Sequence, residues 1–138
     1  MLGPELFLKI VLAVIFSGLI GLEREVKERP AGLRTHILVC LGAALLTLVS
    51  VDYFPTTSDS AARIISGIIT GIGFLGAGTI INSDHHVSGL TTAAGVWVVA
   101  GLGIILGLGY YYLALVSTAV IILILKMSNV EQLLHKNR

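Results

Sequence analysis

The side chains that could take part in chemistry lie at the ends of long apolar runs and not within them. Glu23 and Arg24 leave the first run, while Arg34 and His36 enter the second. Ionised groups beside such runs normally find partners, so these four side chains could form a paired polar cluster. Anchoring of the arginines to anionic lipid headgroups explains them equally well. The sequence leaves both interpretations open.

Two later apolar runs also begin with polar residues. Arg63 opens the third run, one helical turn after Asp59, with which it could pair. Thr91 and Thr92 open the fourth run together with small residues. There we favour a helix start packed closely against its neighbour over a polar lining, because hydroxyls cap helices and small residues permit close approach.

Two motifs suggest ligands, but neither has the context that it needs. Residues 71–76 match GxGxxG, yet a dinucleotide site requires a preceding strand, and this match lies inside an apolar run. Asp84, His85 and His86 could ligate a metal, but nothing nearby completes a ligand set. No Ser/His/Asp or Cys/His arrangement indicates catalysis. We therefore predict no enzyme activity, no catalytic residue, no cofactor and no metal site.

The composition indicates that membrane spans position these residues. Of the 138 residues, 55% are hydrophobic and only 12% are charged, and the mean hydropathy is +0.94. Soluble domains carry roughly 25% charged residues. We predict an all-α, polytopic membrane helix bundle: one transmembrane domain, residues 1–138, with five transmembrane helices at about 6–22, 35–51, 61–81, 90–106 and 110–125.

Positive charge is unevenly divided between the two ends of this predicted bundle. One end carries only Lys9 and Arg63, whereas the other carries Arg24, Lys27, Arg29, Arg34, Lys126, Lys136 and Arg138. Loops rich in Lys and Arg remain in the cytoplasm. We therefore expect the N-terminus outside and the C-terminus in the cytoplasm.

A glycine-rich stretch, residues 63–95, is predicted to form the buried centre of the bundle. In a bilayer, small residues hold helices together by allowing their backbones to approach. A broken or re-entrant third helix is the main structural alternative. The glycines expected to pack helices are Gly67, Gly71, Gly73, Gly76, Gly78 and Gly95.

Three successive segments resemble the transmembrane domain of the MgtC/SapB family. They read GLIGLEREVKERPAGLRTHILVCLGAALLTLVS, RIISGIITGIGFLGAGTII and VSGLTTAAGVWVVAGLGIILGLG, and they cover about residues 17–109. The resemblance implies a bacterial cytoplasmic membrane protein with five spans. Because virulence-type members continue into a soluble C-terminal domain and this sequence ends at Arg138, the short SapB-like branch is the closer comparison. The motif positions implied as functional are Glu23, Arg24, Arg34, Thr35, Arg63, Thr91 and Thr92.

The resemblance also implies a role in magnesium homeostasis through other membrane complexes, ATP synthase among them, and not through carriage of magnesium. The sequence agrees, because no ionised residue lies at the middle of any predicted span, where ion pathways usually need one. We expect a non-enzymatic modulator that associates with the lipid bilayer and with a second copy, as a dimer, or with another membrane complex, and that binds no nucleic acid. A small oligomeric channel or transporter is the alternative. Binding of a lipid or a small anion at the cytoplasmic arginine cluster, which includes Arg24 and Arg34, is a third possibility.

Overall fold

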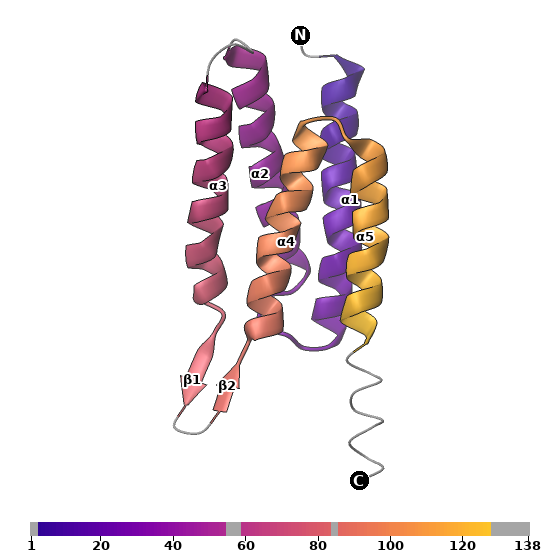
Figure 1. Cartoon of the computed structure of the whole chain (residues 1–138). Helices are drawn as coiled ribbons and strands as arrows, with labels where there is room; N and C mark the ends of the chain where they lie inside the picture. Colours follow the sequence, from indigo (N-terminus) through magenta and orange to yellow (C-terminus); the bar gives the residue numbers. More distant parts are fainter. Residues whose placement is uncertain (1–2, 55–58, 84–85, 128–138) are drawn as a thin grey trace.

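The computed structural model describes residues 3–54, 59–83 and 86–127, and in these it is a bundle of antiparallel helices (Figure 1). Two short strands, β1 (Ile81–Ser83) and β2 (His86–Ser88), pair antiparallel between the third and fourth helices, with Asn82 opposite Val87. The predicted all-α bundle is confirmed. Its helices are α1 (Pro4–Val26), α2 (Leu33–Tyr53), α3 (Ser60–Ala77), α4 (Leu90–Gly107) and α5 (Tyr111–Lys126).

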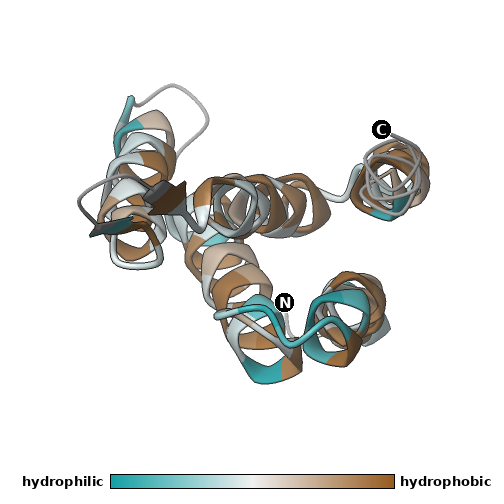
Figure 2. Ribbon diagram, turned by 90° about the horizontal axis from the view of Figure 1, so that it is seen from below, coloured by the Kyte–Doolittle hydropathy of each residue, from teal (hydrophilic) through white to brown (hydrophobic). Residues whose placement is uncertain are grey.

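Four helices, α1 to α4, are each long and apolar enough to cross a membrane. The fifth, α5, is apolar but has only 16 residues. At 1.5 Å per residue it reaches about 24 Å, at the short end of what a ~30 Å hydrocarbon layer requires. Figure 2, a view from the end where α1 finishes, shows α4 as predominantly hydrophobic, while hydrophilic residues gather around the α1–α2 connection.

Glycines and a proline mark the connections. Pro30 and Gly32 lie between α1 and α2, where proline disfavours a continuous helix because it has no amide hydrogen to donate. Gly109 has a φ of 85° and forms the turn between α4 and α5. Such left-handed backbone is readily accessible to glycine. The expected spans each overlap one helix.

The third helix ends earlier than expected, at Ala77 and not near Ile81. Thr79 donates both its amide and its hydroxyl to the carbonyl of Gly76, at 3.0 and 2.8 Å, which tightens the chain into a turn. After this turn, β1 and β2 form a hairpin that leads into α4. From Ser60 to Ala77 the helix is continuous, so it is not broken.

The buried centre of the bundle lies between α2 and α4, with α1 against α2. A Cβ on Gly103 of α4 would meet the carbonyl of Cys40 and lie 2.9 Å from the Cβ of Ala43 on α2. One turn on, a Cβ on Gly107 would lie 2.7 Å from the Cβ of Thr47. These two glycines let the α2 and α4 backbones approach closely.

The prediction that the glycine-rich stretch forms this centre is met only in part, because Gly95 in α4 is buried whereas most of α3 is not. Much of α3 is exposed, and a Cβ on Gly67, Gly71 or Gly73 would have no atom of another described residue within 4 Å. In α3 itself, Gly76 is buried, beside Ala93 of α4. The prediction weighed glycine density alone, whereas burial depends on which face of the helix the glycines occupy.

Two earlier interpretations concern residues outside the described part of the chain. The first is the possible metal site, because Asp84, His85 and the side chain of His86 lie outside the described residues. The second is the positive charge of the tail at 128–138, which contains Lys136 and Arg138.

Candidate functional site

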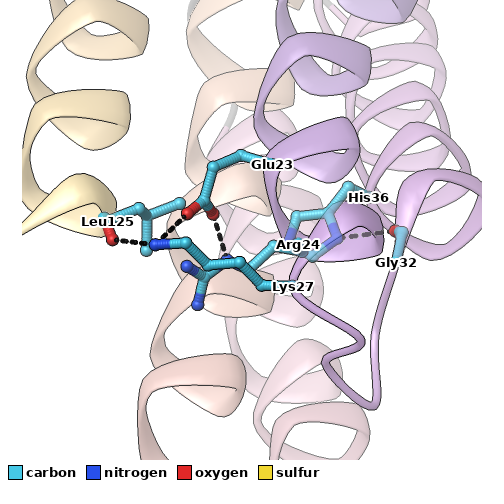
Figure 3. Close-up of polar contacts among 6 residues, drawn as sticks. All are labelled: Glu23, Arg24, Lys27, Gly32, His36 and Leu125. Atoms are coloured by element: carbon cyan, nitrogen blue, oxygen red, sulfur yellow. Dashed lines mark hydrogen bonds and ion pairs between the residues drawn. The ribbon is translucent and has the colours of Figure 1, made fainter. Parts of the chain in front are cut away.

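The end of α1 carries an ion-pair cluster that links two helices (Figure 3). Glu23 accepts from Nε of Arg24 through Oε2, at 2.5 Å, and its Oε1 lies 2.8 Å from Nζ of Lys27. Lys27 also donates to the carbonyl of Leu125 at the end of α5, at 3.3 Å. One carboxylate therefore orders two cations, and one of those cations reaches a second helix.

Arg24 is unusual because its guanidinium is buried. The residue is 2% exposed, and within the described residues its Nη2 atom has no hydrogen-bond partner. A buried donor without an acceptor is unfavourable by about 1–3 kcal/mol, and more when it is charged. The guanidinium therefore has capacity for a further acceptor.

His36, on the first turn of α2, is a further buried polar residue at this end of the bundle. Its Nδ1 lies 2.8 Å from the carbonyl of Gly32, which can only accept, so Nδ1 carries the proton. Its Nε2 is buried, has no hydrogen-bond partner among the described residues, and faces Gly95 of α4, where a Cβ would lie 3.6 Å away. A bulky residue at position 95 would displace this ring.

Three of the candidate residues line one cavity of about 500 Å³ where α1 ends and α4 begins. These are Arg24, Thr91 and Thr92, and Glu23 lies behind them through its bond to Arg24. Thr92 is 3% exposed, whereas Thr91 is exposed. The alternating burial follows from the helix, which turns neighbouring residues about 100° apart.

The other candidates lie elsewhere. Arg34 and Thr35 are exposed and line a neighbouring cavity of about 610 Å³ under the α1–α2 connection, which shares Arg29 with the first cavity. Arg63 is exposed near the start of α3, at the opposite end of the bundle, and its amide donates to the carbonyl of Asp59 at 2.9 Å. The expected cluster of Glu23, Arg24, Arg34 and His36 is therefore only partly assembled, without Arg34.

The donors around the Arg24 cavity suit an acceptor and not a cation. Guanidinium and hydroxyl groups line its wall, and no carboxylate is among the described lining residues. In the described part of the chain, no three His, Cys, Asp or Glu side chains group together in a way that could hold a metal ion.

Sequence reasoning missed several residues that matter here. Lys27 counted only as a positive charge, but it links α1 to α5. Arg29 lines the Arg24 cavity, and Gly103 and Gly107 position α4. The four-residue spacing of Gly103 and Gly107 places both on one helix face. Gly67 and Gly71 have the same spacing, but a Cβ on either would meet no atom within 4 Å, so spacing alone does not identify the glycines that pack.

Comparisons with known proteins identify the relatives of this chain. The model of the MgtC family matches residues 10–133. The "Putative magnesium transporter YhiD" of Escherichia coli strain K12 is 36% identical over 141 residues, covering 96% of this chain and 66% of its own length. "Protein MgtC" of Salmonella typhimurium is 45% identical over 115 residues, covering 83% of this chain and 48% of its own.

A third relative, an uncharacterised protein of Haemophilus influenzae, is 36% identical and covers 92% of this chain. The chain spans less than two thirds of the length of each of these relatives. No solved structure matches it significantly.

Proposed function

This chain belongs to the MgtC family, and on that premise we propose that it is a non-enzymatic protein of the bacterial cytoplasmic membrane that influences magnesium handling by associating with other transmembrane helices. The chain is a multi-pass membrane protein, because it combines several long apolar helices with this family. A magnesium role is supported by the name of the Escherichia coli relative, "Putative magnesium transporter YhiD".

An open groove between α2 and α3 is the observation that carries the proposal. It encloses about 490 Å³, and Gly42 of α2 and Gly67 and Gly71 of α3 line it. A Cβ on any of these three glycines would meet no atom within 4 Å. Lipid tails do not drive helices together, so close approach at small residues is what favours association in a bilayer.

A second copy of the chain is the occupant that this groove fits. Gly67 and Gly71 are four residues apart and so lie on one face of α3. When two identical chains meet about a two-fold axis, the same patch serves both partners. Two α3 helices could therefore cross at these glycines and form a dimer.

The proposal is tested by replacing, one at a time, two glycines of α3 that have no atom of another described residue near them. Gly71→Leu puts a bulky side chain into the α2–α3 groove, whereas Gly73→Leu puts it into a different groove, between α3 and α4. Neither leucine displaces a described residue at its Cβ, so both variants should fold. Gly71→Leu should lose self-association, measured by energy transfer between labelled copies in liposomes, and Gly73→Leu should keep it.

The two variants should also differ in their effect on cell growth. Gly71→Leu should lose the effect of the protein on growth at low magnesium, and Gly73→Leu should retain it. A Gly71→Leu protein that folds and self-associates like the wild type would contradict the proposal.

A small magnesium conduit is the second candidate, because one relative is named a putative magnesium transporter. Purified protein in liposomes that hold a fluorescent magnesium indicator distinguishes the two. Selective magnesium entry that Thr91→Val abolishes would favour the conduit, since Thr91 lines the cavity at the end of α4. An unchanged indicator signal would favour the association role.

A further inference from the structure

We propose that the cavity between the end of α1 and the start of α4 binds a phosphate group. The cavity encloses about 500 Å³, and its polar wall consists of Arg24, Arg29, Thr91 and Thr92. This site is separate from the α2–α3 groove, so the inference does not depend on the proposed association.

Arg24 supplies a preformed donor. Glu23 holds its Nε, which fixes the plane of the guanidinium, while the buried Nη2 has no hydrogen-bond partner in the described part of the chain. Guanidinium groups bind phosphate oxygens with strong, charge-assisted hydrogen bonds. A phosphate oxygen in the cavity would satisfy this donor.

The start of α4 supplies a second set of donors. The first amides of a helix have no intrahelical acceptor, and Gly89 at the N-cap position has no side chain with which to accept from them. The start of α2 is different, because the carboxylate of Glu25 accepts from the amide of Leu33 at 2.9 Å. An uncapped helix start is a ready site for an anion, because its amides and its dipole both favour negative charge.

Two threonine hydroxyls and an excess of positive charge at the cavity also favour an anion. Thr92 is buried on the cavity wall and Thr91 lies beside it, so two hydroxyls adjoin the uncapped helix end. Glu23 offsets the charge of Arg24, but Arg29 also lines the cavity, and no acidic residue does so among the described residues. A tetrahedral phosphate presents several acceptor oxygens and can meet arginine, hydroxyl and amide donors together, which a single-atom anion cannot.

Two sources of phosphate share this chemistry. The cavity is also lined by apolar side chains, among them Leu90, Ile124 and Leu125, which would suit the glycerol and the first acyl carbons of an anionic lipid. Free inorganic phosphate needs only the polar wall. Separate arms of one experiment distinguish these sources.

The experiment measures the melting temperature of the full chain in dodecyl maltoside, a detergent that contains no phosphate. One arm adds inorganic phosphate, and the other adds phosphatidylglycerol. A rise in the first arm identifies free phosphate, and a rise confined to the second identifies a lipid phosphodiester. No rise in either arm would overturn the proposal.

Arg29→Gln is the test variant, because Arg29 is exposed and forms no described ion pair, so its loss should not unfold the chain. Its apparent affinity for whichever probe raises the melting temperature of the wild type should fall by about tenfold, as expected for the loss of one charge-assisted hydrogen bond. Arg34→Gln is the control, since Arg34 lies at the same end of the bundle but outside this cavity. An equal loss in both variants would show a diffuse charge effect and refute the site.

Discussion

At the scale of single residues, the position of a glycine on its helix matters more than the number of glycines. Gly101 and Gly103 lie on one helix, two residues apart. A Cβ on Gly101 would meet nothing within 4 Å, whereas one on Gly103 would meet the carbonyl of Cys40 and the Cβ of Ala43. The tight α2–α4 packing therefore depends on particular glycines, and sequence reasoning could not rank them without knowing which faces meet.

Gly103→Ala should destabilise the protein, with Gly101→Ala as its matched control. The new methyl group at position 103 would push α4 away from α2, and overpacking of this kind costs about 1–3 kcal/mol. Thermal unfolding in detergent should show a lower melting temperature for Gly103→Ala and no loss for Gly101→Ala. Equal melting temperatures for the two variants would contradict the packing described here.

At the scale of elements, the connection between the β-hairpin and α4 positions the hydroxyl donors at the start of α4. Gly89 has a φ of 88°, and a Cβ there would meet the carbonyl of Thr79. The hairpin thus holds the start of α4, with Thr91 and Thr92, against the end of α3. The sequence analysis predicts no strands here, and the two strands pair with Ile81 opposite Ser88.

Gly89→Ala should therefore destabilise more than Gly109→Ala. Both glycines have left-handed backbone, which costs about 1–2 kcal/mol for other residues. Only at position 89 would the methyl group also collide with backbone, because at position 109 its nearest neighbour is a side-chain carbon of Lys9 at 3.6 Å. Chemical denaturation of both variants measures the difference. A loss at 109 equal to that at 89 would show that the hairpin contact is unimportant.

At the scale of the whole molecule, charge is divided between the ends of the bundle as the sequence predicts. Lys9 and Arg63 lie near the end where α1 begins, whereas Arg24, Lys27, Arg29, Arg34 and Lys126 lie near the end where α1 finishes. The positive-inside rule favours placing the second end in the cytoplasm. This orientation stays a prediction.

Labelling of introduced cysteines tests the orientation. Cys40 is the one cysteine of the chain and is buried, so Cys40→Ala gives a suitable background. In intact cells, a membrane-impermeant maleimide should label Asp59→Cys but not Glu28→Cys. Glu28→Cys should react only after the membrane is permeabilised. The reverse pattern would invert the topology and place the Arg24 cavity outside the cell.

The sequence by itself determined the fold class, the family and the approximate helix positions, because apolar runs of span length and their charged ends are local properties. Only the tertiary structure decided that α2 and α4 form the centre and that α3 lies to the side. It also decided that Arg24 shares a cavity with Thr91 and Thr92, while Arg34 lines a different one. Distant segments meet according to which helix faces pack, and in a uniformly apolar chain the hydrophobic pattern does not mark those faces.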